Sequence, residues 1–177
     1  MRKLVVTEFL SLDGIMEEPS WTMPYWNDEI AKFKDDEQRT CDALLLGRVT
    51  YQGFAAAWPE SDDEGADIMN SLPKYVASTT LDKVEWQNSS LLKGDVVEAI
   101  TQLKQQVGRD ILVYGSATLV QTLMQHDLVD CYRLLVYPVV LGKGIRLFQA
   151  GTTATLQLVE TQSFNGGVVA LIYEPKR

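Results

Sequence analysis

The chain has 177 residues, 46% of them hydrophobic, which is long enough to bury a sizeable core in one domain. Its 16 Lys and Arg against 24 Asp and Glu give a formal net charge of −8, which repels nucleic acid and anionic lipid at long range. We therefore expect a single domain over residues 1–177, with no nucleic-acid or membrane partner and with any anionic ligand held by local contacts.

The first residues, MRKLVVTEFLSLDG, begin with cations as a secretory signal does, but Glu8 interrupts the apolar run and no small-residue cleavage site follows. We interpret this segment as a strand and expect a cytoplasmic protein. No apolar run approaches the roughly 18 residues that span a membrane. Cys41 and Cys131 lie far apart and match no metal-binding spacing, which indicates small buried residues.

Strands and helices alternate along the chain. The run Ala43–Leu46 is apolar on both faces, as a central parallel strand should be. The acidic stretch 59–67 predicts a solvated loop or a helix start rather than a metal site. The elements predicted up to residue 79 are strands over 3–9, 43–46 and 74–79 and helices over 27–38 and 50–58.

The clearest helix pattern covers residues 94–108. Asp95 followed by Glu98 predicts a capping box at its start, and Gly108 is expected to close it. Its predicted apolar face consists of Val96, Ile100, Leu103 and Val107.

Residues 110–114 predict the next buried strand, followed by a helix over 115–125 with Ser116 as N-cap. The C-terminal strands are expected over 131–140, 155–164 and 168–174, the last two joined by the hairpin turn Asn165-Gly166-Gly167. The predicted fold class is α/β, with a mostly parallel central sheet, helices on both faces and antiparallel C-terminal strands.

The ends of three predicted strands carry small or hydroxylic residues. In open α/β sheets, ligands bind beyond the carboxyl ends of strands, where helix N-termini present free N–H groups. At the first such end, Gly47 permits close approach, Arg48 can bond phosphate oxygens, and Thr50 adds a hydroxyl. The alternative is a strand-to-helix turn with a surface arginine.

Two further segments repeat this pattern. DILVYGSATLV places Gly115 and Ser116 at a helix start, and KYVASTT ends its strand in Ser78 and Thr79. Three such ends in one parallel sheet suit a dinucleotide lying across the sheet edge. Neither the GxGxxG fingerprint nor the Walker GxxxxGK[ST] motif occurs.

The segments SLDGIM, ALLLGRVTYQGF, ILVYGSATLVQTLM and YPVVLGKGIRLF, in this order and spacing, resemble the dihydrofolate reductase-like superfamily. The resemblance is closest to stand-alone relatives of the riboflavin biosynthesis (RibD) C-terminal reductase domain, and it covers nearly the whole chain. It implies a mainly parallel sheet flanked by helices, NADPH as cofactor and assembly as a homodimer.

The same resemblance assigns roles to individual residues. Gly47, Arg48 and Thr50 match the segment that grips the cofactor's phosphates, and Ser78 and Thr79 match the strand end near the adenosine ribose. The segment matched to the pyrophosphate and nicotinamide consists of Tyr114, Gly115, Ser116, Ala117, Thr118 and Leu119.

Two acids are the candidate catalytic residues. EIAKFK resembles the dihydrofolate reductase helix whose acidic residue faces the pterin, which makes Glu29 the carboxylate and Phe33 its neighbour one turn later. Glu29 is equally an ordinary helix-start acid. Asp13, in the loop that closes over substrate in relatives, is the second candidate. The aromatic residues of 20–26 could wall a planar ring, cover the core or form a dimer contact.

Two departures from the family pattern concern the cofactor. Dihydrofolate reductases have Gly-Gly with a cis peptide bond where this chain has Gly115-Ser116, and a non-proline cis bond costs about 2.5–4 kcal/mol, so its geometry is left open. The segment ASTTLDK lacks the arginine that usually binds the 2′-phosphate, which leaves Lys83 or Arg48. NADPH is the expected cofactor, and NADH is not excluded.

A third departure concerns the substrate. Riboflavin reductases typically carry a lysine where this chain has Ile15, and Glu17 and Glu18 follow. Carboxylates disfavour a phosphorylated ribityl substrate, so we expect a reaction related to that of riboflavin biosynthesis rather than the reaction itself.

These observations predict an NADPH-dependent reductase of a small heteroaromatic substrate, either pterin-like or pyrimidine-like. The alternative is a non-catalytic nucleotide- or ligand-binding module that kept the fold. A purely structural dimerisation domain is the weakest interpretation, because it has no need for the motifs at three strand ends.

Overall fold

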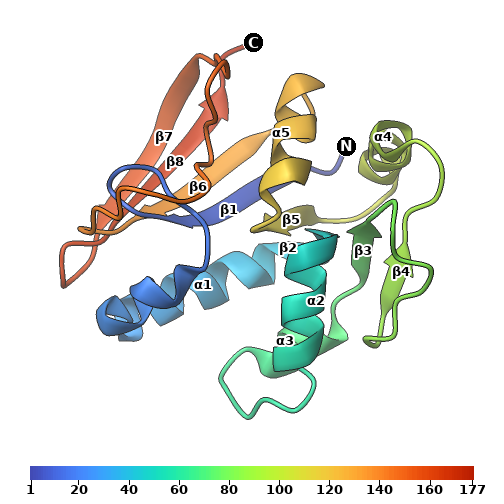
Figure 1. Cartoon of the computed structure of the whole chain (residues 1–177), viewed down its shortest axis with the longest axis horizontal. Coiled ribbons are helices and arrows are strands. Elements are labelled where there is room, and N and C mark those ends of the chain that lie inside the picture. Colours follow the sequence, from blue (N-terminus) through green and yellow to red (C-terminus); the bar gives the residue numbers. More distant parts are fainter.

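The computed structural model describes residues 1–177 and contains one eight-stranded sheet with the strand order β4-β3-β2-β5-β1-β6-β8-β7 (Figure 1). In this order, neighbouring strands from β4 to β6 pair in parallel. The strand β8 pairs antiparallel with both β6 and β7. The strands are β1 Leu4–Leu10, β2 Cys41–Gly47, β3 Lys74–Ala77, β4 Ser89–Leu91, β5 Asp110–Tyr114, β6 Cys131–Val136, β7 Leu156–Ser163 and β8 Val169–Pro175.

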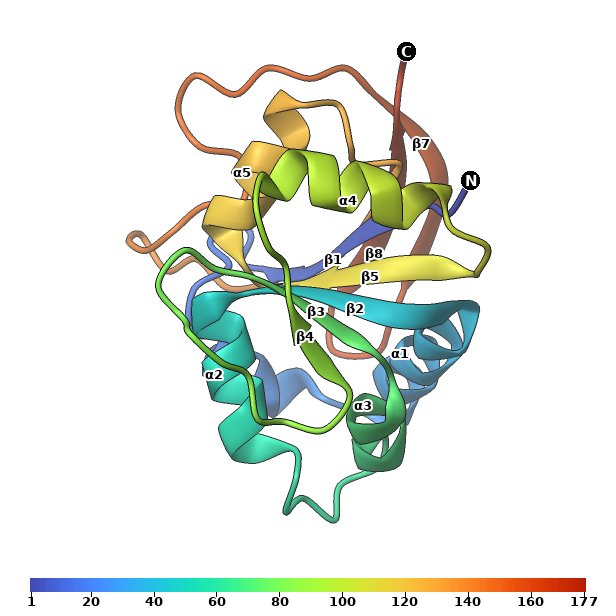
Figure 2. The same ribbon diagram turned by 90° about the vertical axis from the view of Figure 1, so that its right-hand side faces the viewer.

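Helices cover both faces of the sheet. The edge-on view of Figure 2 shows α4 and α5 on one face and α1, α2 and α3 on the other. The α/β class and the antiparallel C-terminal end predicted from the sequence are therefore confirmed. The helices are α1 Asp28–Thr40, α2 Arg48–Ala57, α3 Ala66–Ser71, α4 Val96–Gln105 and α5 Ala117–Gln125, with a 3-10 helix, η1, over Pro19–Tyr25.

Each face of the sheet has its own apolar core. Successive side chains of a strand point to opposite faces, so Leu44 and Leu46 join the core under α1 while Ala43 and Leu45 join the core under α4 and α5. All four are buried. The double-sided burial of this strand is the reason that Ala43–Leu46 is a continuous apolar run.

The start of α4 was predicted correctly and its end was not. The Asp95 side chain accepts a hydrogen bond of 2.9 Å from the Glu98 N–H. The helix ends at Gln105, however, and Val107 lies beyond it, fully exposed. Gly108 serves a tertiary contact instead, since a Cβ there would lie 2.8 Å from Asp42 Oδ2, beside the ion pair of Asp42 with Arg2.

The acidic stretch 59–67, predicted to be a solvated loop or a helix start, leads into the short helix α3, which begins at Ala66. Gly65, with φ +87°, precedes it, and Lys74 from β3 holds its C-terminal end. The Lys74 ammonium donates to the carbonyls of Met69 and Asn70 at 2.8 and 3.0 Å and lies 3.9 Å from the Trp86 ring centroid. Burial lowers the pKa of Lys74 to about 8.

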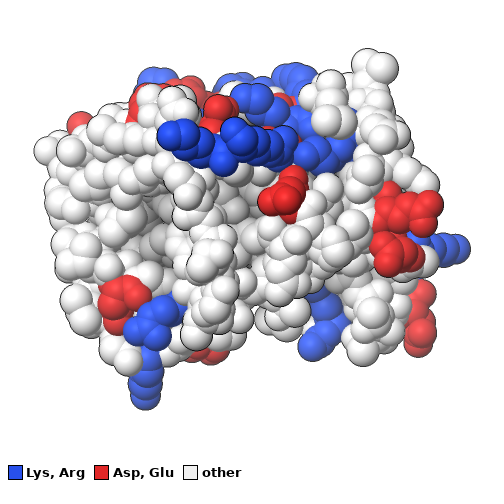
Figure 3. All heavy atoms as spheres, turned by 90° about the horizontal axis from the view of Figure 1, so that it is seen from above, with Lys and Arg blue, Asp and Glu red and all other residues white.

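Both cysteines are free and buried, as predicted, and burial raises the pKa of each thiol to about 11. None of the helices has the length and apolar character needed to cross a lipid bilayer. Charge is unevenly spread despite the acidic total: on the face shown in Figure 3, Lys and Arg side chains gather in a band along one side.

Candidate functional site

The parallel strands β3, β2, β5 and β1 are neighbours, so their carboxyl ends lie at one edge of the sheet. Gly47 ends β2, Tyr114 ends β5, and Ser78 follows β3 directly. Gly47 and Ser116 touch: the Gly47 N–H donates to Ser116 Oγ at 2.8 Å. The structure therefore brings the Gly-Arg-x-Thr segment and the Gly115-Ser116 turn into direct contact.

The Gly115-Ser116 turn is held by a set of short hydrogen bonds. The Ser116 N–H donates to Thr50 Oγ1 at 3.0 Å, and the Ser116 hydroxyl donates to the Tyr114 carbonyl at 2.8 Å. The Gly115 N–H donates to Glu8 Oε2 at 3.1 Å. These N–H groups, expected from the sequence to cradle phosphate, thus have protein partners. No peptide bond in the chain is cis, which includes this turn.

Gly115 must be glycine for two reasons. Its φ of +53° lies in the left-handed region, and a Cβ at this position would lie 2.6 Å from Thr50 Oγ1. Ser116 also has a positive φ, of 62°, at some cost in strain. The turn is therefore as tight as the sequence pattern predicts, and Thr50 is one of the groups that makes it so.

The two helices that begin at these strand ends have open N-termini. Neither Gly47 before α2 nor Ser116 before α5 caps its helix with a side chain. By contrast, Asn27 caps α1 and Asp95 caps α4. The first-turn N–H groups of α2 and α5, including those of Ala117, Thr118 and Leu119, therefore lack a side-chain acceptor and suit an anion.

Arg48 is exposed, and its guanidinium makes a single long contact of 3.3 Å with Gln52 Oε1. It is therefore available to a ligand. At the ribose-side strand end, Ser78 Oγ accepts from the N–H groups of Thr80 and Leu81 at 3.2 and 3.0 Å, while Thr79 is exposed. Lys83, the other candidate for a 2′-phosphate, is paired with Glu85 at 2.8 Å.

Asp13 connects the loop after β1 to a distant segment. One of its oxygens accepts from the Ser11 hydroxyl at 2.6 Å and from the Leu141 N–H at 3.1 Å, and the other accepts from the Gly142 N–H at 2.8 Å. These bonds, led by that of Ser11, lower the pKa of Asp13 to about 2. This geometry favours a residue that holds the loop in place.

Glu29 and Phe33 both reach the β7–β8 turn. Glu29 Oε2 accepts from the Asn165 N–H at 2.9 Å and is otherwise exposed, while Phe33 packs edge-on against Phe164 with centroids 5.5 Å apart. The two residues share a helix face, as predicted, but this face meets the antiparallel hairpin.

The aromatic residues of η1 pack against the end of the sheet. Trp21 and Tyr25 lie edge-on to Tyr137, at 5.6 and 5.8 Å between centroids, and Trp26 lies edge-on to Phe9. The buried Tyr137 hydroxyl has no hydrogen-bond partner. Of the interpretations left open by the sequence, this arrangement favours a cover over the core.

Sequence reasoning missed a buried group of charges on the α1 face. The Lys34 ammonium bonds Glu37 and, at 2.7 Å, the Thr7 hydroxyl, and the Arg133 Nε donates to Glu37 Oε2 at 2.7 Å. Lys34 and Glu37 are buried. A signal was present, because helical spacing places these residues on the same stripe as the apolar Ile30 and Phe33.

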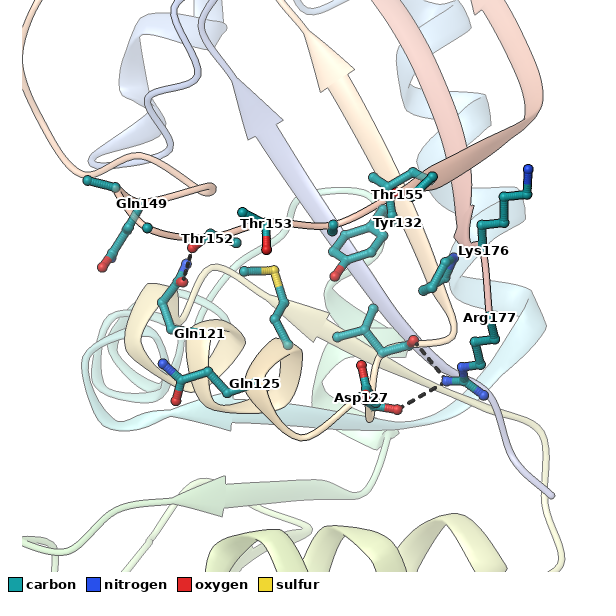
Figure 4. Close-up of a pocket in the computed structure, with 17 residues that line it drawn as sticks. Gln121, Gln125, Asp127, Tyr132, Gln149, Thr152, Thr153, Thr155, Lys176 and Arg177 are labelled. Carbon is teal, nitrogen blue, oxygen red and sulfur yellow. Dashed lines mark hydrogen bonds between the residues drawn. The ribbon is translucent and has the colours of Figure 1, made fainter.

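One cavity, about 940 Å³ in volume, lies away from these strand ends (Figure 4). Gln121 and Gln125 of α5 form one wall, and Tyr132 and the C-terminal Lys176 and Arg177 lie opposite. Tyr132 lies at the amino end of β6, and Lys176 and Arg177 follow the carboxyl end of β8. We place the candidate site at the carboxyl edge instead, because the open helix ends and Arg48 lie there. A second cavity, about 370 Å³, adjoins the first loop at Ile15 and Glu17.

Solved structures with this architecture include reductases. A candidate riboflavin biosynthesis protein from Shewanella sp. PV-4 superposes with a TM-score of 0.78 at 20% identity over 99% of both chains. Dihydrofolate reductase from Enterococcus faecalis, solved in complex with NADP(H), superposes with a TM-score of 0.66 at 14% identity over 99% of this chain and 97% of its own. The fold is therefore dihydrofolate reductase-like.

Residues 2–170 match the model of the RibD C-terminal domain family. The uncharacterized protein YyaP of Bacillus subtilis (strain 168) is 29% identical over 178 residues, covering 97% of this chain and 94% of YyaP. The chain belongs to the RibD C-terminal domain family, as the motif series predicted.

We expect the Asp13→Asn substitution to loosen the first loop. An amide accepts the N–H bonds of Leu141 and Gly142 more weakly than a carboxylate does, so hydrogen exchange of these two amides should accelerate. Because the folded pKa is lowered from 3.8 to about 2, the contribution of Asp13 should be complete above pH 3.8 and disappear as the pH falls through 2. Asp62→Asn, in the exposed acidic loop, is the matched control. Unchanged exchange in Asp13→Asn would contradict the loop-holding role.

Proposed function

We propose that this protein is a reductase that uses NADPH to reduce a small heteroaromatic substrate, pterin-like or pyrimidine-like. The observation that carries the proposal is the pair of uncapped helices, α2 and α5, that begin side by side next to the exposed Arg48, whose guanidinium bonds Gln52 at 3.3 Å. The family and the dihydrofolate reductase solved with NADP(H) support the same cofactor.

The residues at the strand ends fit a dinucleotide. First-turn N–H groups of α2 and α5 would bind the pyrophosphate, and Arg48 would add a charge-assisted contact. Gly115 keeps the turn close to α2, since a Cβ there would lie 2.6 Å from Thr50 Oγ1. Ser78 and Thr79 would lie on the adenosine side. NADPH supplies a hydride when it is bound. NADH is a weaker candidate in this proposal.

The substrate side of the proposal involves Glu29 and Asp13. Glu29 would hold a ring nitrogen from the edge of α1, and Asp13 would hold the loop that covers the substrate. The Trp21 and Tyr25 rings exclude water beside Tyr137. Glu17 and Glu18, at the second cavity, disfavour a phosphorylated substrate there.

A non-catalytic binding module is the second candidate function. The observation that favours it is that both candidate catalytic acids bond backbone N–H groups: Glu29 bonds that of Asn165, and Asp13 bonds those of Leu141 and Gly142. Such a module would bind the nucleotide through the same helix ends without turnover.

We expect Arg48→Ala to weaken NADPH binding by about 10- to 150-fold, because a charge-assisted contact contributes about 1.5–3 kcal/mol. Isothermal titration at low and raised salt measures this, and raised salt should weaken wild-type binding. Arg39→Ala is the matched control, since Arg39 is an exposed arginine that pairs with Asp35 at 2.8 Å on α1. Equal affinity of Arg48→Ala and wild type would refute the phosphate contact. Gly115→Val is a poorer test, because its side chain would collide with Thr50 and disturb folding.

For Glu29→Gln we expect NADPH affinity within about twofold of wild type and loss of turnover, since the charge is lost at similar volume. The measurement is the loss of NADPH absorbance with a panel of reducible pterins and aminopyrimidines. Glu160→Gln, exposed on β7, is the matched control. If Glu29→Gln retained wild-type turnover, Glu29 would be a cap for the hairpin turn only. If wild type turned over none of the panel while binding NADPH, the binding module would be favoured.

A homodimer is also part of the proposal. The strand β6 is largely buried within its own chain. The segment after it exposes Val140, Ile145 and Phe148, and these apolar side chains support a partner surface. We expect light scattering to give twice the chain mass and Ile145→Glu to lower it. A monomer mass at every concentration would exclude the dimer.

A further inference from the structure

Glu8 is a buried carboxyl placed under the Gly115-Ser116 turn. It is 5% exposed and lies in β1, next to β5 in the sheet. Its Oε2 accepts from the Gly115 N–H at 3.1 Å, and its buried Oε1 has no hydrogen-bond partner. A carboxyl with a free oxygen is an expensive group to bury, and an apolar residue is the ordinary occupant of such a strand position.

Glu8 shares the α4–α5 face of the sheet with Val6 and Leu10, so the charges that act on it from the α1 face do so across the sheet, and they come from two elements. Helix α1 contributes Lys34 and Glu37, and β6 contributes Arg133, which pairs with Glu37. Helix α5, which begins two residues after Gly115, has no ionisable side chain. Lys34, Glu37 and Arg133 together carry one net positive charge. The ionised form of Glu8 cancels that charge, and the protonated form leaves it in place.

Burial raises the pKa of Glu8 well above that of an ordinary glutamate, Lys34 opposes this rise, and Glu37 adds to it. Glu8 can accept the hydrogen bond from the Gly115 N–H in either of its protonation states. The turn is thus held in both states, and only the local charge changes.

We propose that Glu8 is a positioning residue that must hold a proton for an anionic cofactor to bind at the Gly115-Ser116 turn. This inference rests on the proposed function, because it requires phosphates at the start of α5. An ionised Glu8 would place a second anion beside those phosphates in a water-poor environment. Binding of the cofactor would accordingly favour the protonated form, and affinity would fall as the pH rises through the pKa of Glu8.

The test is isothermal titration of NADPH into wild type and Glu8→Gln between about pH 6 and pH 9. Glutamine keeps a carbonyl acceptor for the Gly115 N–H and cannot ionise. We expect the wild-type affinity to fall by about 10- to 100-fold as Glu8 ionises, at whatever pH this occurs. Glu8→Gln should keep the low-pH affinity throughout and change by less than about threefold. The titration of the NADPH 2′-phosphate is common to both proteins and cancels in the comparison.

Two further measurements separate charge from structure. Wild type should take up more protons on binding than Glu8→Gln, seen as a larger difference in binding enthalpy between phosphate and Tris buffers. Glu8→Leu, which leaves the Gly115 N–H without an acceptor, should bind weakly at every pH. Glu160→Gln should follow the wild-type profile. Circular dichroism checks that each variant is folded.

Identical pH profiles of wild type and Glu8→Gln would overturn the role of Glu8 and leave the cofactor assignment intact. Weak binding by folded Glu8→Gln at every pH would do the same, since it would mean that the carboxylate itself is required. If wild type bound neither NADPH nor NADH at any pH, the cofactor assignment and the role of Glu8 would both be wrong.

Discussion

The contact between the Gly115-Ser116 turn and the start of α2 is the constraint on which the site depends. Ser116 accepts the Gly47 N–H and donates its own N–H to Thr50, so two neighbouring strands end in a single interlocked unit. The N–H groups of Gly47 and Ser116 are hydrogen-bonded within this unit. An anion at this edge must therefore bind the first turns of α2 and α5, which the interlock holds side by side.

The contact of the Gly115-Ser116 turn with Gly47 and Thr50 includes features that lower the stability of the folded chain. Ser116 has a left-handed conformation, which costs about 1 kcal/mol or more for a residue other than glycine. The absent side-chain cap costs about 1 kcal/mol for α5 and only a few tenths of a kcal/mol for α2, whose N-cap residue is Gly47. Helices α1 and α4 carry side-chain caps, so the chain can form caps where nothing else competes for the N–H groups. The short helix α3 also lacks a side-chain cap, so what sets α2 and α5 apart is that their two uncapped starts lie side by side at one edge of the sheet.

Elements that are determined by residues close together in the sequence could be predicted from it. The strand Asp110–Tyr114 and the Asp95 cap depend on residues close in sequence, and both were found. Gly108 was misassigned because its role is the approach to Asp42 and Arg2, which are far away along the chain. Glu8 was noticed only as an interruption of an apolar run, since Gly115, which it bonds, is 107 positions away. The periodicity of side chains along the sequence does not reveal such pairings, because they arise from the order of the strands in the sheet.

The antiparallel C-terminal part of the sheet contributes to the site as much as the parallel part. Asp13 bonds the N–H groups of Leu141 and Gly142, and Glu29 bonds that of Asn165, at separations of more than a hundred residues. The loop after β1 and the start of α1 are thus positioned by segments that follow β6 and β7. A change in either segment would move a candidate acid without altering the carboxyl ends of β2 and β5, because these are held together separately by Ser116 and Thr50. If the proposed function holds, cofactor binding and substrate choice would therefore depend on separate contacts.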